Sequence, residues 1–362
     1  MKQNILLVIT FLLTGIFITN AQTEKEKAID KKVNALLSQM TLDEKIGQMT
    51  QVDYDAIKKN VNDIVKYSIG SILCGGNSEP DDITAKGWAD LYDKYQNIAL
   101  KTRLKIPIIW GIDAVHGHNN VDGATIFPHN IGLGATRNPK LIEQVAAVTA
   151  AEIKGTGMQW DFAPCVAVAR NERWGRTYES YGENPDLVKM LGAAYVKGMQ
   201  GKDLADKTSV LACVKHFVGD GGTTNGKDQG NTEVDEETLR KLHMQGYVEA
   251  IRAGAKSIMV SYSSWNGEKL HGHKYLLTDV LKGELGFKGF VVSDWAAIDQ
   301  LDKDYKSDIE KSINAGLDMI MIPNAPGQEN NYVDFITKLK ELVSENKVPL
   351  SRIDDAVKRI LK

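Results

Sequence analysis

Chemically reactive side chains stand where apolar runs of this sequence end. In the clearest case, residues 289–295, an apolar run stops at a serine that is followed by Asp294 and Trp295. An uninterrupted β-branched run is typical of a strand buried on both faces. Asp294 would then lie at the carboxyl end of a strand, where βα-repeat enzymes collect their catalytic groups. The alternative is that Asp294 caps the next helix, because aspartate is a good N-cap residue.

Other apolar runs end in, or are followed by, a carboxylate, a guanidinium, an ammonium, an imidazole or a phenol. These groups belong to Asp113, Arg176, Lys215, His216 and Tyr262. Carboxylates and cations hydrogen-bond vicinal hydroxyls, and indoles such as that of Trp295 stack on the C–H faces of sugars. The mixture therefore indicates a neutral, polyhydroxylated ligand.

Each of these residues also has a structural interpretation. Asp113 is also suited to capping a helix, Arg176 to a solvated surface position and Tyr262 to the core. Lys215 and His216 are harder to explain in this way, because they follow a buried-looking run in which an unpaired charge is costly. We expect Lys215 to face an anion, either Asp294 or Asp113.

Other catalytic classes lack their signatures. His116 and His118 share the polar loop after Asp113, but they lie two residues apart, and the sequence has no H-E-x-x-H motif or Cys pair, so no metal site is expected. No G-x-G-x-x-G motif follows the first strands and no G-x-S-x-G elbow is present, which argues against dinucleotide binding and a Ser/His/Asp hydrolase. We expect no cofactor.

The elements that must position these groups alternate along the chain. Seven strand-like runs lie at residues 68–74, 106–113, 158–164, 210–217, 257–263, 289–295 and 318–323. Amphipathic segments between several of them predict parallel strands joined by crossover helices. A closed barrel needs eight strands, so we expect an α/β fold, a (β/α)8 TIM-like barrel with one short or irregular strand near residues 46–52. The alternative is an open doubly wound sheet.

Composition sets the broad class. The 362 residues are 43% hydrophobic and 25% charged, with a net charge of −3 and no basic block, so nothing points to nucleic acid or to an anionic membrane. Three cysteines, Cys74, Cys165 and Cys213, argue against a disulfide scaffold, although one bridged pair stays open.

The first 21 residues predict a Sec signal peptide. Lys2 precedes an apolar run over residues 5–18, and a small-residue cleavage site follows, with cleavage expected after Ala21. The run is shorter than the ~20 residues that a membrane span needs. No cysteine follows the run to carry a lipid, so we expect no membrane anchor. The sequence therefore predicts a periplasmic or secreted protein with one domain over residues 22–362.

The longest motifs resemble the N-terminal barrel domain of glycoside hydrolase family 3, especially its β-glucosidases and exo-β-glucanases. They are GIDAVHGHNN at residues 111–120, ATIFPHNIGLGAT at 124–136, RWGRTYESYGE at 173–183, KHFVGDGG at 215–222, SYSSWNG at 261–267 and GFVVSDW at 289–295. Motifs this long and in this order are highly specific, and the resemblance runs from about Val33 to the last residue. It implies a (β/α)8-like barrel and a retaining mechanism.

Carried over motif by motif, the resemblance implies that Asp294 is the nucleophile and that Trp295 helps to line the next subsite. The glycone would be bound by Asp113, Arg176, Lys215, His216 and Tyr262. A nucleophilic carboxylate must be ionised at neutral pH, and neighbouring cations would favour that form. It would attack the anomeric carbon through an oxocarbenium-like transition state and form a glycosyl-enzyme.

The resemblance does not supply a proton donor. In two-domain members the acid/base glutamate lies on a C-terminal domain, and this sequence stops where that domain would begin. Single-domain N-acetylglucosaminidases of the family use an Asp/His pair after the Lys-His-Phe motif, but residues 218–231 contain no histidine. The in-chain candidates are Glu179, Glu183, Asp220 and Asp228. A separate C-terminal domain polypeptide is the other source.

The resemblance thus predicts an exported hydrolase that releases terminal β-linked glucose from gluco-oligosaccharides. Two alternatives stay open. One is a different glycone, such as a β-xyloside or an N-acetyl-β-glucosaminide. The other is a truncated or split member that lacks its acid/base and binds sugar without cleaving it.

Overall fold

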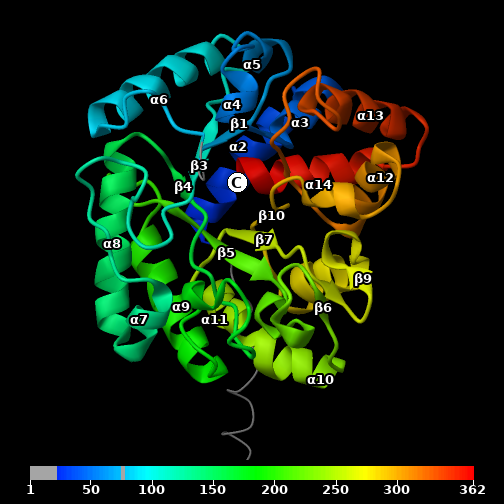
Figure 1. Ribbon diagram of the computed structural model, residues 1–362. Coiled ribbons are helices and arrows are strands. Elements are labelled where there is room, and N and C mark those ends of the chain that lie inside the picture. Colours follow the sequence, from blue (N-terminus) through cyan, green and yellow to red (C-terminus); the bar gives the residue numbers. More distant parts are fainter. Residues whose placement is uncertain (1–22, 75–77) are drawn as a thin grey trace, which may run out of the picture.

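The computed structural model describes residues 23–74 and 78–362 (Figure 1). The predicted signal peptide, residues 1–21, lies outside the described residues. In the described part of the chain, no helix combines the length and the apolar character that crossing a bilayer requires. Cys74, Cys165 and Cys213 are free and buried, so none of them is bridged.

Eight parallel strands follow one another in chain order around a barrel. They are β1 (Thr50–Asp53), β2 (Ser71–Cys74), β3 (Ile109–Ile112), β4 (Trp160–Asp161), β5 (Leu211–Phe217), β7 (Ser257–Val260), β10 (Phe290–Val292) and β11 (Ile320–Ile322). β11 pairs with β1, whereas β10 and the chain leading into β11 meet at an isolated bridge between Val292 and Met319. The barrel is therefore nearly closed, with one unsealed seam. The predicted (β/α)8 barrel is confirmed, the open doubly wound sheet is wrong, and the strand expected near residues 46–52 is β1.

The strands are buried on both faces, which explains their continuous apolar sequences. Inward-pointing side chains form one cluster inside the barrel, made of Leu73, Trp160, Phe162, Leu211, Cys213, Met259, Phe290, Val292, Met319 and Met321. Outward-pointing side chains, such as that of Val291, join a larger cluster with the surrounding helices. Successive strand residues point to opposite faces, so one short strand such as β10 serves both clusters.

Helices surround the strands (Figure 1). They are α2 (Glu24–Leu37) and α3 (Leu42–Gln48) before β1, α4 (Tyr54–Ile57) and α5 (Asp63–Lys66) after β1, α6 (Ala85–Ala99) after β2, α7 (Asn130–Ala135) and α8 (Pro139–Gly155) after β3, α9 (Pro185–Gln200) after β4, α10 (Glu236–Thr238), η4 (Leu239–His243) and α11 (Gln245–Arg252) after β5, η6 (Tyr275–Glu284) after β7, α12 (Tyr305–Ala315) after β10, and α13 (Tyr332–Ser344) and α14 (Leu350–Leu361) after β11. Side-chain N-caps mark the start of several of these helices. Asn138, for example, accepts the Leu141 N–H and Pro139 opens the first turn of α8.

The two ends of the barrel are closed differently. At the amino end, Ile360 of α14 packs against the interior cluster and lies beside Gly70 and Ile109, where β2 and β3 begin. At the carboxyl end, the loops after β5 and β7 form a small sheet of β6 (Asn231–Thr232), β8 (Ser264–Trp265) and β9 (Glu268–Lys269). The small sheet holds the loops after β5 and β7 beside the carboxyl ends of the barrel strands. A cavity lies at the same end of the barrel.

Candidate active site

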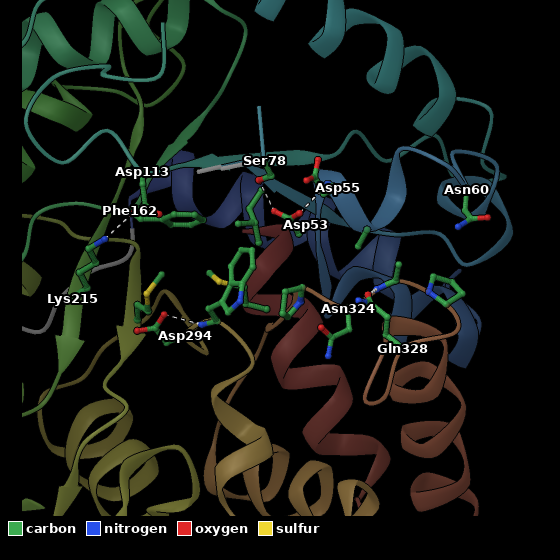
Figure 2. Close-up of a pocket in the computed structure, with 18 of the residues that line it drawn as sticks. Asp53, Asp55, Asn60, Ser78, Asp113, Phe162, Lys215, Asp294, Asn324 and Gln328 are labelled. Carbon is green, nitrogen blue, oxygen red and sulfur yellow. Dashed lines mark hydrogen bonds and ion pairs between the residues drawn. The ribbon is translucent and has the colours of Figure 1, made fainter. Parts of the chain in front are cut away.

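A cavity of about 890 Å³ lies at the carboxyl ends of the strands. Asp113 follows β3, Lys215 and His216 lie near the carboxyl end of β5, and Asp294 follows β10. All four line the cavity. Parallel strands bring their carboxyl ends to one rim, so residues far apart in sequence meet here. Figure 2 shows Asp113, Lys215 and Asp294 converging on one side of the cavity.

The floor of the cavity is apolar. It includes Phe162, Leu73, Met259 and Met321, all members of the cluster inside the barrel. Gly111 of β3 makes room for one of them, because a Cβ at this position would lie 2.3 Å from the Phe162 ring. The polar groups therefore stand on a packed base that holds them in place.

Lys215 is paired with Asp113. Its Nζ lies 2.8 Å from Asp113 Oδ1, and only 5% of the lysine side chain is exposed against 44% of the aspartate. Burial pushes the pKa of Lys215 down, but the carboxylates of Asp113 and Glu179 outweigh it and hold the pKa above its usual value. The sequence left open whether Lys215 faces Asp294 or Asp113, and the structure selects Asp113.

Arg176 is clamped by Glu179. Its Nε and Nη2 donate to the two carboxylate oxygens at 2.7 and 2.8 Å. Burial alone would raise the pKa of Glu179, but the two hydrogen bonds from Arg176 outweigh it and the pKa is lowered. Glu179 is therefore ionised and occupied, which makes it a poor proton donor.

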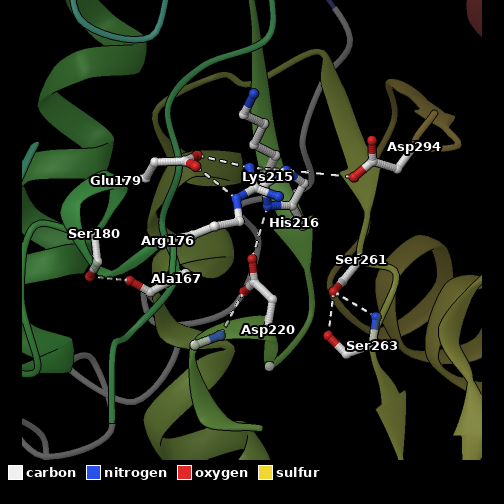
Figure 3. Close-up of polar contacts among 12 residues, drawn as sticks. Ala167, Arg176, Glu179, Ser180, Lys215, His216, Asp220, Ser261, Ser263 and Asp294 are labelled. Atoms are coloured by element: carbon white, nitrogen blue, oxygen red, sulfur yellow. Dashed lines mark hydrogen bonds and ion pairs between the residues drawn. The ribbon is translucent and has the colours of Figure 1, made fainter. Parts of the chain in front are cut away.

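His216 is neutral and fully hydrogen-bonded (Figure 3). Arg176 Nη2 lies 3.1 Å from Nε2, and Asp220 Oδ2 lies 2.9 Å from Nδ1. A guanidinium can only donate, so Nε2 accepts and Nδ1 carries the proton that Asp220 accepts. Burial, reinforced by the charges of Arg176 and Lys215, puts the pKa of His216 well below its usual value.

Asp294 has one oxygen held and one without a partner. Oδ1 accepts the Trp295 N–H at 2.7 Å, whereas Oδ2 has no hydrogen-bond partner among the described residues and lies 3.7 Å from His216 Nε2. Burial raises the pKa of Asp294 to about 6, against the opposing pull of Arg176, the Trp295 N–H and Lys215. The carboxyl group is therefore ionised at neutral pH.

Trp295 and Tyr262 flank this carboxylate. The indole lines the cavity and remains 41% exposed. Tyr262 is not among the cavity-lining residues, and its hydroxyl donates to the Trp295 backbone carbonyl. Six of the seven site residues predicted from the sequence thus border one cavity, and Tyr262 contacts the turn beside it.

The comparison that decides the family concerns nearly the whole described chain. The family model described as "Glycosyl hydrolase family 3 N terminal domain" matches residues 41–362 of this chain. The chain belongs to glycosyl hydrolase family 3.

Relatives of this family 3 domain agree with that assignment. The lysosomal beta glucosidase of Dictyostelium discoideum is 35% identical, over 92% of this chain and 43% of the relative. The exo-1,3/1,4-beta-glucanase from a Pseudoalteromonas species is 43% identical with a TM-score of 0.86, over 94% of this chain and 43% of that one. A glucose complex of the beta-glucosidase from Listeria innocua gives 30% identity and a TM-score of 0.79, over 92% of this chain and 46% of that one. The chain spans less than half the length of these relatives.

The sequence reasoning missed Asp53, which lines the same cavity at the end of β1. Its Oδ1 accepts the Asp55 N–H at 2.8 Å and its Oδ2 accepts the Ser78 hydroxyl at 2.6 Å, while burial raises its pKa to about 6. Both oxygens are used, so Asp53 holds the loop after β1 in this family 3 domain. β1 reads Thr-Gln-Val-Asp, so no continuous apolar run marks this strand end, and the strand was expected to end one residue earlier, near residue 52.

The other acid/base candidates from the sequence are also held away from the cavity. Asp220 is buried against His216, Asp228 accepts the Trp174 indole N–H at 3.1 Å, and Glu183 is exposed. None of them lines the cavity of about 890 Å³.

The two loop histidines likewise serve the loop and not the cavity. His116 Nδ1 lies 2.9 Å from the Phe127 carbonyl oxygen, and the buried His118 bonds Thr156 Oγ1 at 3.1 Å.

One cluster has metal-like spacing in the part of the chain that the structure describes. Ligand atoms of Cys165, His216 and Asp220 lie within 4.8 Å of one another, and all three residues are buried. The imidazole and the carboxylate already bond each other, and Arg176 contacts the same ring. Burial also raises the pKa of the Cys165 thiol. This donor set favours an orienting hydrogen bond over a metal site.

Proposed function

We propose that this domain hydrolyses terminal β-glucosides with retention of configuration, with Asp294 as the nucleophile. The observation that supports the proposal is the uneven bonding of its carboxylate, in which Oδ1 is held by Trp295 and Oδ2 is left without a partner among the described residues. An attacking carboxylate needs an oriented group with one available oxygen. The names of the relatives, beta glucosidases and an exo-beta-glucanase, support the substrate class.

We propose that the ion pairs beside Asp294 bind the glycone. One carboxylate oxygen of Asp113 accepts a hydrogen bond from Lys215, and the other can accept one from a ligand. The ammonium group of Lys215 has two further N–H donors. An acceptor and a charged donor side by side match two adjacent sugar hydroxyls, which both donate and accept. Arg176 and His216 border the same space, and Trp295 offers an exposed indole face to the leaving sugar.

The proposed reaction has two displacements. Asp294 Oδ2 bonds to the anomeric carbon as the bond to the leaving oxygen breaks, and a general acid gives that oxygen its proton. Water then attacks the same carbon, a general base takes its proton, and Asp294 leaves as the carboxylate. Two inversions at one carbon give net retention.

We propose that the acid/base carboxyl comes from a C-terminal domain or from a separate polypeptide. The in-chain candidates are bonded elsewhere or exposed, and the relatives are more than twice as long as the region they share with this chain. We also propose export through a signal peptide over residues 1–21. A periplasmic beta-glucosidase of Salmonella typhimurium that is 33% identical supports that location.

The test uses a leaving group that needs no acid. We expect the purified chain to turn over 2,4-dinitrophenyl β-glucoside, and added azide to yield the β-glucosyl azide, because azide captures the glycosyl-enzyme without a general base. The matched β-xyloside and N-acetyl-β-glucosaminide should react more slowly. Absence of both turnover and azide product, with glucose still bound, would favour a sugar-binding domain instead.

A further inference from the structure

We propose that His271 is a positioning residue that fixes the direction in which the Asp294 carboxylate points. The imidazole lies on η5 (Leu270–Gly272), is 1% exposed and does not line the cavity. Its contact is with the backbone of Asp294, not with the carboxylate. The inference rests on the proposed function only in taking Asp294 as the nucleophile.

The hydrogen bonds of His271 define its tautomer. Nε2 accepts the Asp294 N–H at 3.0 Å, and the ring also bonds the Ser261 backbone. A neutral imidazole has one donor and one acceptor nitrogen. A backbone N–H can only donate, so Nε2 is bare and Nδ1 carries the proton that the Ser261 carbonyl accepts. The ring therefore connects Ser261, directly after β7, to Asp294, two residues after β10.

His271 keeps this acceptor across the working pH range. Burial, aided by the charge of Lys269, lowers its pKa to about 3. Protonation would place an N–H on Nε2 against the N–H of Asp294 and break the contact. Lys269 is itself held in place, because its Nζ donates to the Tyr262 carbonyl at 2.8 Å.

The turn that carries Asp294 needs such ties. Ala296 has φ +49°, a left-handed conformation that is unfavourable for a non-glycine residue and is kept only where its surroundings enforce it. The Trp295 carbonyl accepts from Tyr262, and the Ala296 N–H donates to the Met321 carbonyl at 3.3 Å. These contacts act on the residues after the nucleophile.

His271 accepts the N–H of Asp294 itself, whereas the Asp294 carbonyl accepts the Ala297 N–H at 3.1 Å within the turn. Without His271, the Asp294 N–H is a buried donor with no acceptor, which carries the free-energy cost of an unsatisfied polar group. The carboxylate can relieve that cost by folding back onto its own N–H. Oδ1 would then leave the Trp295 N–H, and Oδ2 would lose the place it has 3.7 Å from His216 Nε2.

Two substitutions of similar size separate positioning from packing. His271→Gln sets its amide near the Nε2 position and keeps an acceptor for Asp294. His271→Asn sets its amide near the Nδ1 position, keeps the donor to Ser261 and loses that acceptor. If the imidazole contributes only packing, both variants should give the same result.

The experiment measures inactivation of the full chain by 2,4-dinitrophenyl 2-deoxy-2-fluoro-β-glucoside, with rate and inhibitor affinity determined separately. We expect His271→Asn to slow covalent labelling about 100-fold, as misplacement of a reacting group by about 1 Å does, with inhibitor affinity within about threefold of wild type. His271→Gln should stay within about tenfold of the wild-type rate.

Equal losses in both variants, or wild-type labelling of His271→Asn, would overturn the inference. A wild-type chain that is not labelled would instead overturn the proposed function and this inference with it. Imidazole ¹⁵N chemical shifts of the unsubstituted chain give a check that does not depend on the folding of a variant. They should report a proton on Nδ1 of His271, and a proton on Nε2 would contradict the proposal.

Discussion

Each end of the barrel holds a buried aspartate near an arginine and a lysine, but the two ends use their charges differently. At the amino end, Asp318 Oδ1 accepts from Lys282 at 2.7 Å and from Arg352, and Oδ2 accepts the Val291 N–H at 2.8 Å. Every oxygen is bonded, and the last bond crosses the unsealed seam between β10 and β11. This arrangement contributes to the fold.

At the carboxyl end the same kinds of group are paired so that one carboxylate is left incomplete. Lys215 bonds Asp113 and Arg176 bonds Glu179, so neither cation bonds Asp294 directly. Their charges still favour the ionised form of Asp294, while its Oδ2 stays without a partner in the described part of the chain. Stability and reactivity are therefore separated by where hydrogen bonds are placed, not by which residue types are present.

Removing Asp294 should have the largest effect on activity and the opposite effect on stability from removing Asp318. We expect Asp294→Asn to lower turnover about 10⁶-fold, the scale of the loss when a catalytic nucleophile is removed. Turnover of aryl β-glucosides by the purified variant measures this. Glucose should still bind with near wild-type affinity, and activity above about 10% of wild type would contradict the assignment.

The stability effect of Asp294→Asn follows from the raised pKa. The folded chain binds the proton more tightly than the unfolded chain, with a pKa of about 6 against the usual 3.8. Ionisation of Asp294 therefore costs nothing below about pH 4 and roughly 3 kcal/mol above about pH 6. We expect the variant to melt at a higher temperature than wild type at pH 7 and at nearly the same temperature at pH 4, by calorimetry.

Asp318→Asn should destabilise the protein at neutral pH. It removes the fully buried counter-charge of Lys282 and Arg352 and leaves them only the partly exposed Asp355. Removing one partner of a buried ion pair typically costs about 3–5 kcal/mol. Urea unfolding followed by circular dichroism measures the loss. Turnover by the folded fraction at low temperature should remain near wild type, and a primary loss of turnover would show that the two ends are not separable.

The pH dependence of wild-type activity should follow Asp294. Only the ionised carboxylate attacks, so kcat/KM is expected to fall as the pH drops through about 6, the pKa of Asp294. Activated aryl glucosides isolate this limb because they need no general acid. A limb below pH 4 would mean that the cavity does not raise the pKa of the nucleophile.

Trp295→Ala should have the smallest effect. The indole is 41% exposed, so its loss should hardly change stability. If it stacks on the leaving sugar, kcat/KM for a β-linked disaccharide should fall about tenfold, corresponding to an aromatic contact of about 1.4 kcal/mol. Equal losses for a disaccharide and for methyl β-glucoside would place the indole elsewhere than on the leaving group.

The sequence predicted the barrel because buried parallel strands leave long apolar runs. It also predicted that Asp113, Lys215 and Asp294 lie together, because the carboxyl ends of parallel strands meet at one rim of the barrel. It could not choose the partner of Lys215, since a rim brings several carboxylates within reach. No sequence pattern indicated a role for His271, because it does not follow a barrel strand. It lies after β9, and only the folded path of this loop brings it to the Asp294 N–H. Tyr262 carried a site motif but contacts the turn, since its hydroxyl is taken by the Trp295 carbonyl.

The role of Asp294 as nucleophile is tested by finding where a trapped sugar is attached. The purified chain is inactivated with 2,4-dinitrophenyl 2-deoxy-2-fluoro-β-glucoside, digested and analysed by tandem mass spectrometry. We predict one fluoroglucosyl group, on Asp294, and none on the Asp294→Asn variant. A label on another carboxylate, or equal labelling of the variant, would contradict the claim that the unpartnered oxygen of Asp294 is the nucleophile.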